Sequence, residues 1–267
     1  YNIVNFPCGN TGAQMGGWYR KEIKSLEDVK GMKMRIGGFG GKILEGIGGV
    51  PQNIPGGEIY QALEKGTVDA AEWIGPYDDL KLGFYKVAKH YAYPAWWEGG
   101  PQLDLYVNTK VWDSLSAEHK AIIDAAATYT HIDIQAKYDY RNAFALKQLV
   151  AGGAQLFPLP KDMTDAAFKA SEELYADLSA KNPNWKKVYA DYSAWRREAN
   201  IWFRVTEARF DSFMQSAKLA FGSTTSADVR PDLTATIRQS SRLMSGIETI
   251  SILSSKIVTS EDDFLKT

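Results

Sequence analysis

The sequence predicts an α/β fold with a mostly parallel sheet, and three observations lead to this prediction. Of the 267 residues, 45% are hydrophobic and 24% are charged, which is typical of a chain with an ordinary core and one or two domains. Short apolar runs alternate with helical patterns over the first hundred residues. Glycine is concentrated in the same region, since only Gly152, Gly153, Gly222 and Gly246 of the 23 glycines lie beyond residue 100.

The glycine-rich part is predicted to contain strands and helices in alternation. Four apolar runs predict strands over Met32 to Ile36, Val50 to Ile54, Val68 to Trp73 and Tyr91 to Trp97. The segments between them predict helices over Gly41 to Gly48, Gly57 to Lys65 and Pro76 to Lys89. Gly66 is expected to end the second of these helices, because a left-handed residue is favoured just after a helix.

Longer elements are predicted beyond residue 101. Alternating apolar residues predict a strand over Gln102 to Asn108, and the prolines after Gln155 restrict the strand from there to Leu159 to a short or edge position. Ser116 is expected to cap an alanine-rich helix that continues to about Val150 and ends at Gly152 and Gly153. Two more helices are predicted over Asp162 to Ala180 and Trp185 to about Ala220, separated by Asn182-Pro183-Asn184.

Aromatic and aliphatic residues follow one another at helical spacing along the last of these helices: Trp195, Trp202, Val205 and Phe213. Such a stripe is most often directed at the core of its own chain. It can also form the surface that binds a partner helix, and the sequence leaves both interpretations open.

Composition changes again after Phe221, where Gly222 to Ser226 is a linker-like run. We therefore expect two parts: a domain over 1–221, with a lobe at 32–107 and a helical or hinge part at 108–221, and a Ser/Thr-rich tail over 222–267. Leu233 to Leu253 could form an amphipathic helix in that tail. The first residues form no export signal, so we expect the native start to be missing or removed, and no apolar stretch reaches the ~18 residues that cross a bilayer.

Several classes of function are disfavoured. The net charge of −1 offers no overall basic field for nucleic acid. Cys8 is the single cysteine, and no zinc-ligand spacing relates it to the three histidines. The cluster Gly37 to Gly41 lacks the spacing of a nucleotide-binding loop, and no Gly-x-Ser-x-Gly elbow is present.

Arg35 is the first candidate for a binding residue. It ends an apolar strand at the expected carboxyl edge of a parallel sheet, where ligand clefts form. A guanidinium can hold a carboxylate through two parallel hydrogen bonds. The plainer interpretation is an exposed strand-end arginine or a structural ion pair.

Two carboxylates, Glu72 and Glu98, follow predicted strands and are expected near the same edge. Two carboxylates in a partly buried site repel each other unless one is protonated or a cation bridges them. A hard cation with oxygen ligands is one solution, with Gln14 or a backbone carbonyl completing the shell. The alternative is a glycoside hydrolase, with sugars stacking on nearby tryptophans at positions 73, 96 and 97. Surface carboxylates without a function are the third interpretation.

The segment from Ile54-Pro55-Gly56-Gly57-Glu58 to Trp73, followed by Gly75-Pro76-Tyr77-Asp78-Asp79, resembles the solute-binding subunit of tripartite ATP-independent periplasmic (TRAP) transporters of the DctP type. Lys33-Met34-Arg35 and Trp96-Trp97-Glu98-Gly99-Gly100 make the chain similar to the branch that binds 2-oxo acids such as pyruvate. The resemblance covers roughly residues 1 to 215. It implies a non-catalytic, periplasmic protein with two α/β lobes and a long C-terminal helix.

The resemblance also implies roles for particular residues. Arg35 would clamp the carboxylate of the substrate, and Gln14, Glu72, the Trp73 carbonyl and Glu98 would hold a sodium ion beside it, with Gln14, Trp73 and Glu98 also bordering the substrate. Two glutamates, one monovalent cation, one arginine and one ligand carboxylate sum to −1, which is easier to desolvate than the glutamate pair alone. The implied partners are the membrane permease subunits and a second copy of the chain, bound through the C-terminal helix.

Two departures from that family are expected to matter. The first lobe would be incomplete, because a full member has an export signal and over a hundred residues before the position of Tyr1. The tail after about Gln215 does not resemble the family. A truncated fragment that binds no ligand is therefore a further alternative.

Overall fold

The computed structural model describes residues 2–216. Contacts divide the chain into two compact units, Tyr1–Lys181 and Asn182–Thr267. The predicted tail over 222–267, with its amphipathic helix over Leu233 to Leu253, lies outside the described residues.

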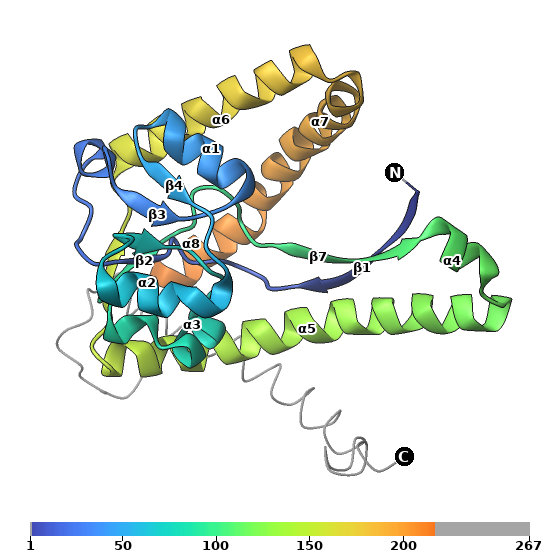
Figure 1. The fold of residues 1–267 in the computed structure, drawn as a ribbon, viewed down its shortest axis with the longest axis horizontal. Coiled ribbons are helices and arrows are strands. Elements are labelled where there is room, and N and C mark those ends of the chain that lie inside the picture. Colours follow the sequence, from blue (N-terminus) through green and yellow to red (C-terminus); the bar gives the residue numbers. More distant parts are fainter. Residues whose placement is uncertain (1, 217–267) are drawn as a thin grey trace, which may run out of the picture. The chain divides into compact units, whose positions relative to one another are not determined.

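A six-stranded sheet forms the centre of the first unit (Figure 1). Its strands are β2 (Trp18–Tyr19), β3 (Lys33–Arg35), β4 (Val50–Gln52), β5 (Ala70–Ala71), β6 (His90–Tyr93) and β8 (Gln155–Pro158). They lie in the order β4-β3-β5-β2-β6-β8. The pairs β3–β4, β3–β5 and β6–β8 are parallel, whereas β2 is antiparallel to both β5 and β6. The predicted α/β fold and the edge position of β8 are confirmed. The sheet is mixed, with three parallel and two antiparallel pairs, so its pairing is less parallel than predicted.

A separate two-stranded antiparallel sheet consists of β1 (Ile3–Asn10) and β7 (Gln102–Asn108). β7 has the predicted bounds. β1 and the two-residue β2 were not predicted. The segments 11–17 and 94–101 connect the two sheets and are hydrogen-bonded to each other, from Thr11 N to Pro101 O and from Gln14 N to Gly99 O, both at 3.3 Å.

The helices of the first unit follow the predicted pattern with changes at their ends. They are α1 (Gly38–Gly46), α2 (Ile59–Lys65), α3 (Pro76–Leu82), α4 (Thr109–Ser114), α5 (Ala117–Ala151) and α6 (Lys161–Lys181). The helix predicted over Pro76 to Lys89 is interrupted at Gly83, whose φ of 74° is left-handed. Gly66 ends α2 with a φ of 70°, as predicted, and the Ser116 side chain accepts from His119 N at the start of α5.

Helices cover both faces of the six-stranded sheet. Because successive side chains of a strand point to opposite faces, Tyr19 and Trp18 of β2 enter two different buried clusters. The Tyr19 cluster includes side chains of α1 and α6, and the Trp18 cluster includes side chains of α2 and the end of α5. The unit therefore has a layer of helices on each side of the sheet.

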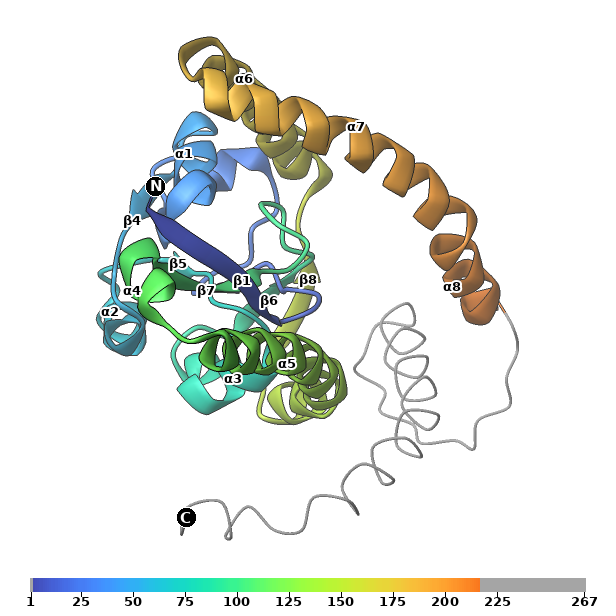
Figure 2. The same ribbon diagram turned by 90° about the vertical axis from the view of Figure 1, so that its right-hand side faces the viewer.

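The 35-residue helix α5 runs beside the two-stranded sheet and reaches α3 next to the six-stranded sheet (Figures 1 and 2). The Asn142 side chain of α5 accepts a hydrogen bond of 2.9 Å from Tyr77 N in the first turn of α3. The Tyr138 hydroxyl donates to Asp78 at 2.6 Å. Helix α5 thus contacts the two-stranded sheet and also α3, a helix next to the six-stranded sheet.

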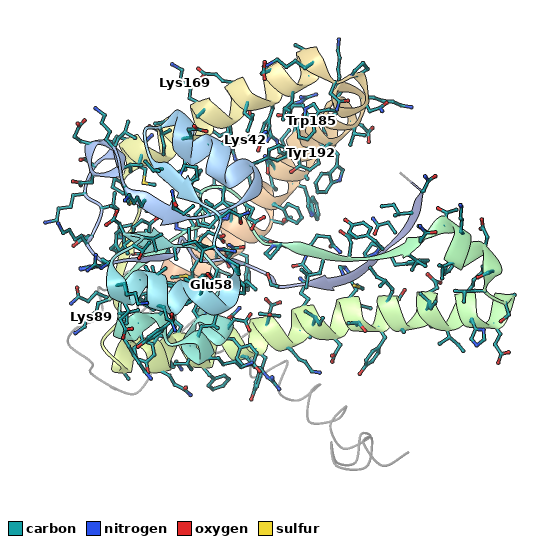
Figure 3. The ribbon with its side chains drawn as sticks, viewed as in Figure 1. Lys42, Glu58, Lys89, Lys169, Trp185 and Tyr192 are labelled. Carbon is teal, nitrogen blue, oxygen red and sulfur yellow. The ribbon has the colours of Figure 1, made fainter. Side chains whose placement is uncertain are left out.

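The described part of the second unit consists of α7 (Pro183–Val205) and α8 (Glu207–Ser216). The single helix predicted over this region is broken at Thr206, whose ψ of −82° departs from helical geometry. Trp195, Trp202, Val205 and Phe213 are all exposed on the described helices, and both interpretations of the stripe, a core-facing surface and a surface for a partner helix, stay open. Trp185 and Tyr192, labelled in Figure 3, belong to a series of aromatic rings along α7 in which Tyr192 and Trp195 lie 6.2 Å apart.

None of the described helices has both the length and the apolar character that crossing a membrane requires.

Candidate functional site

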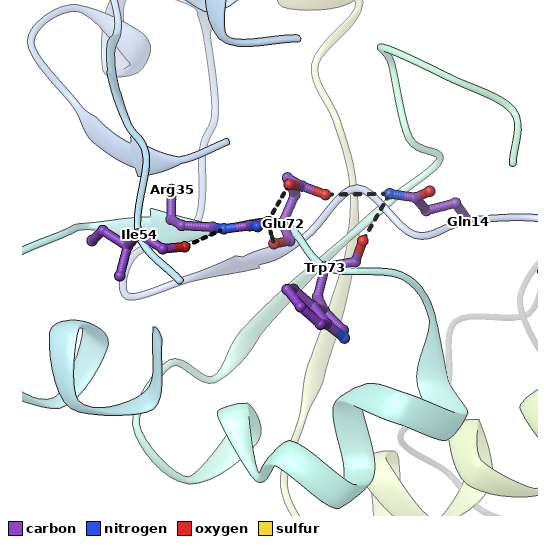
Figure 4. A network of polar contacts seen from close by, with 5 residues as sticks. All are labelled: Gln14, Arg35, Ile54, Glu72 and Trp73. Atoms are coloured by element: carbon purple, nitrogen blue, oxygen red, sulfur yellow. Dashed lines mark hydrogen bonds and ion pairs between the residues drawn. The ribbon is translucent and has the colours of Figure 1, made fainter. Parts of the chain in front are cut away.

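Arg35 and Glu72 meet at the carboxyl edge of the parallel strands β3 and β5. Arg35 is the last residue of β3 and is paired with Ala71 of β5. Glu72 directly follows Ala71. The Nη1 group of Arg35 forms an ion pair with Oε1 of Glu72 and donates to the Glu72 carbonyl at 2.9 Å (Figure 4). The predicted strand-end position of both residues is confirmed. A structural ion pair was one of the interpretations of Arg35 that the sequence left open, and Glu72 was not predicted as its partner.

Two further contacts fix the guanidinium of Arg35. Its Nε donates to the carbonyl of Ile54 at 3.2 Å, and its central carbon lies 5.0 Å from the centroid of the Trp73 ring system. Its Nη2 makes no hydrogen bond to any of the described residues. A carboxylate can therefore bind Nη2 directly, and a two-pronged contact requires Arg35 to release Glu72 or Ile54.

Gln14 reaches the same place from the segment that connects the two sheets. Its side chain is 6% exposed, and its Nε2 donates to Oε2 of Glu72 at 3.5 Å and to the carbonyl of Trp73 at 3.2 Å. Its Oε1 is buried with no hydrogen-bond partner among the described residues. A buried carbonyl oxygen without a partner costs free energy, so this amide is poised for a further contact.

This set of oxygens fits a hard cation. The Nε2 group, with its partial positive charge, lies between a carboxylate oxygen and a backbone carbonyl oxygen. Turning the amide of Gln14 by 180° would bring Oε1 against the same two oxygens. That orientation is favourable when a cation lies among them, because Na⁺ and Ca²⁺ bind carboxylate, carbonyl and amide oxygens. The turn would also give the unpartnered Oε1 a ligand.

The electrostatics of Glu72 agree with a site that lacks enough positive charge. Burial is the main cause that raises the pKa of Glu72 to about 7; Arg35 opposes this rise, and the negative charges of Glu98 and Asp79 contribute to it. A cation close to this carboxylate would favour its ionised form.

Glu98 lies near the site but on a loop. β6 ends at Tyr93, so the prediction that Glu98 lies at a strand end is wrong: the residue belongs to the loop that follows this strand. The residue is exposed as a whole, yet desolvation of its carboxyl raises its pKa, opposed by a hydrogen bond from Trp97. Hydrogen bonds from Ala95 N to Gln14 O and from Gln14 N to Gly99 O hold this loop beside Gln14.

The predicted stacking tryptophans differ in their surroundings. Trp96 and Trp97 lie edge to face at 5.1 Å and pack against the buried cluster that includes Tyr19. Trp73 is the one that contacts Arg35. Among the described residues, no three His, Cys, Asp or Glu side chains gather as a metal cluster, and the predicted cation ligands include only two carboxylates.

Asp79 lies next to the site and was not among the predicted site residues. Its carboxylate is 1% exposed, and its Oδ2 accepts from Trp18 Nε1 at 2.9 Å and from the Tyr91 hydroxyl at 2.7 Å. Burial raises the pKa of Asp79 to about 7. These bonds hold α3, which begins just after Trp73 and Gly75, against β2 and β6. The adjacent Asp78-Asp79 pair at the start of a helix is a weak sequence signal, because such residues are usually solvated.

Comparisons with known proteins show the family to which the chain belongs. The family model of DctP, "Bacterial extracellular solute-binding protein, family 7", matches residues 1–182. A protein of Nostoc sp. (strain PCC 7120), described as a monocarboxylate 2-oxoacid-binding periplasmic protein, is 45% identical over 218 residues, or 82% of this chain. The chain spans 60% of the length of that relative.

Two solved structures are similar over most of the chain. A TRAP transporter solute-binding protein from Bordetella bronchiseptica RB50, a dimer with calcium and picolinate in one site, is 52% identical with a TM-score of 0.77, over 80% of this chain and 63% of its own. A TRAP periplasmic solute-binding protein from Pseudoalteromonas atlantica T6c with bound sodium and pyruvate is 37% identical with a TM-score of 0.76, over 82% and 66%. The predicted fold class, that of TRAP periplasmic binding proteins, is confirmed.

Proposed function

Because this chain belongs to the DctP family of bacterial extracellular solute-binding proteins, family 7, we propose that it binds a small 2-oxo acid of the pyruvate class together with a hard cation. The observation that carries the proposal is the meeting of Arg35 with the buried oxygens of Gln14, Glu72 and Trp73. The relatives described as binding 2-oxo acids or pyruvate support the choice of ligand.

Arg35 binds the ligand carboxylate. A guanidinium is always charged, and its planar donors match the two oxygens of a carboxylate. The contacts to Ile54 and Trp73 hold its plane in place before the ligand arrives, which reduces the ordering cost of binding.

Glu72, Gln14, the Trp73 carbonyl and Glu98 hold the cation, for which we propose sodium, with calcium as the alternative found in relatives. When the cation is bound, its charge offsets the two glutamates and attracts the keto and carboxylate oxygens of the ligand. Glu72 is shared between the two functions. As it turns toward a cation, it loosens its ion pair with Arg35 and makes Nη1 available for the ligand. Cation and carboxylate should therefore strengthen each other's binding.

In this proposal the protein captures a 2-oxo acid and delivers it to a transporter, and Glu72 and Glu98 are ligands of the cation rather than catalytic groups. The hydrolase alternative needs a carboxyl that protonates a leaving group and a second one free to act on the sugar. Glu72 is instead paired with Arg35, and the family consists of solute-binding proteins. The partners we propose are the permease subunits of a TRAP transporter, and the compartment is the periplasm, as for the Nostoc relative.

A thermal-shift experiment tests this function. At a concentration of pyruvate 100 times its Kd, the ligand should stabilise the chain by about 2.7 kcal/mol. For a domain of this size, that is a rise in Tm of roughly 5–10 °C. A chromogenic glycoside should produce neither a shift nor coloured product. Turnover of the glycoside without a shift from any 2-oxo acid would favour the hydrolase, and no response to either would favour a fragment that binds no ligand.

The exposed aromatic series on α7 supports a homodimer through this helix. Aromatic side chains at the centre of an interface contribute ~2 kcal/mol or more each, and Trp195 and Trp202 are both more than 60% exposed. Light scattering should give twice the 29.7 kDa of one chain, and Trp195→Ser with Trp202→Ser should give the monomer. Tyr129→Ser, at an exposed aromatic position of α5, is the control that should remain dimeric. A monomeric parent chain at micromolar concentration would refute the dimer.

A further inference from the structure

We propose that Gly56 is a positioning residue for carboxylate binding: the absence of a side chain there makes room for the indole of Trp73, which in turn holds the guanidinium of Arg35. This inference rests on the proposed function for its effect on ligand affinity. The arrangement of Gly56, Trp73 and Arg35 can be tested without a ligand.

The indole of Trp73 fills the space where a side chain at position 56 would be. A Cβ atom on Gly56 would lie 2.6 Å from Cη2 of Trp73, 3.1 Å from Cζ3 and 3.4 Å from Cζ2. Real Cβ atoms do not approach other atoms to 2.6 Å, so either the ring of Trp73 or the backbone at position 56 would have to move. An indole is rigid, and it can move only by rotating as a whole or by shifting the backbone of Trp73.

Both movements would disturb the site. Rotation of the ring changes its contact with Arg35, whose central carbon lies 5.0 Å from the ring centroid. A backbone shift moves the carbonyl of Trp73, which accepts from Gln14 at 3.2 Å. Figure 4 shows that these three residues lie around Glu72.

The chain around Gly56 contacts Arg35 as well. The carbonyl of Ile54, two residues before Gly56, accepts from Nε of Arg35 at 3.2 Å. One short segment thus contacts both the guanidinium and the indole that packs beside it. A change at position 56 would reach Arg35 from two sides.

Glycine is needed at position 56 because a side chain has no room there, and not because of the backbone conformation. The glycines of left-handed conformation in the described chain do not include Gly56, so an alanine is compatible with its backbone. The next residue, Gly57, is not left-handed either, and a Cβ there would meet nothing within 4 Å. Gly57→Ala is therefore a control that changes the same turn by the same methyl group.

The experiment compares Gly56→Ala with Gly57→Ala by calorimetric titration of pyruvate in sodium buffer. Gly56→Ala should weaken pyruvate binding about tenfold or more, because a displacement of less than 1 Å in a binding group is costly. Gly57→Ala should stay within about twofold of the parent chain, a change of less than 0.5 kcal/mol. Equal affinities in the parent chain and Gly56→Ala, or equal losses in both variants, would overturn the proposal.

A second substitution tests the mechanism directly. Phenylalanine at position 73 lacks the outer ring atoms that lie closest to a Cβ on residue 56. Trp73→Phe should therefore remove the effect of Gly56→Ala, so that the double variant binds pyruvate as Trp73→Phe alone does. A further loss in the double variant would show that the methyl group acts through something other than the indole.

An NMR readout separates this inference from the proposed function. The indole N–H signal of Trp73, identified by its loss in Trp73→Phe, should shift in Gly56→Ala and stay in place in Gly57→Ala. If the parent chain binds no 2-oxo acid, the proposed function fails while this comparison still decides the role of Gly56. An unshifted signal in Gly56→Ala overturns the inference whether or not pyruvate binds.

Discussion

Replacing Arg35 with lysine should weaken pyruvate binding by roughly 100-fold, or about 3 kcal/mol, the upper part of the range for hydrogen bonds to charged groups. Lysine keeps the positive charge, but its ammonium cannot place two donors in one plane against a carboxylate. It also loses the contact from Nε to the Ile54 carbonyl. Stability should change much less, because an ammonium can still pair with Glu72.

Calorimetry measures this effect, and Arg20→Lys is the matched control. Arg20 is exposed and follows β2, away from the carboxyl edge of β3. An Arg35→Lys variant with the affinity of the parent chain would remove Arg35 from the site. Thermal unfolding of both variants without ligand separates lost binding from lost folding.

Removing the cation should have the second large effect. In choline buffer, without sodium or calcium, pyruvate binding to the parent chain should fall by at least about tenfold, because Glu72 and Glu98 are then no longer offset by a cation. Glu98→Gln deletes one anionic ligand, so its pyruvate affinity should differ less between sodium and choline than that of the parent chain. Glu72→Gln is less informative, because it also breaks the ion pair with Arg35.

Titration of pyruvate in the two buffers decides the matter. Glu64→Gln, at an exposed position of α2, removes the same charge away from the site and should keep the full sodium dependence. Equal affinity of the parent chain in sodium and in choline would show that the cation assignment is wrong. A calcium titration in choline buffer then identifies which of the two cations restores binding.

Much of the fold was predictable because its signals are local. The apolar runs before Arg35 and Glu72 predict strands, and Gly66 and Ser116 mark helix ends by their own conformational preferences. β1 was missed because Pro7 and Gly9 interrupt its pattern, and because it is defined by pairing with β7, almost a hundred residues later.

The sequence could predict which residues belong to the site, but only some of the contacts between them. The placement of Arg35 and Glu72 follows from the rule that parallel strands end at one edge. Their mutual ion pair, the buried carboxylate of Asp79 and the contact between Gly56 and Trp73 depend on side chains brought together by the tertiary fold. No spacing along the chain encodes such contacts.

Helix α5 has a mechanical consequence. A helix of 35 residues is a rod about 52 Å long, and this one lies along the two-stranded sheet while Asn142 and Tyr138 fasten it to the first turn of α3. The two sheets are therefore linked by the rigid helix α5 as well as by their two connecting segments. Any swing of one sheet toward the other must carry α3 along or break those two hydrogen bonds. Since α3 starts just after Trp73 and Gly75, a displacement of α3 would also displace the Trp73 carbonyl, which lies only a few residues before the helix.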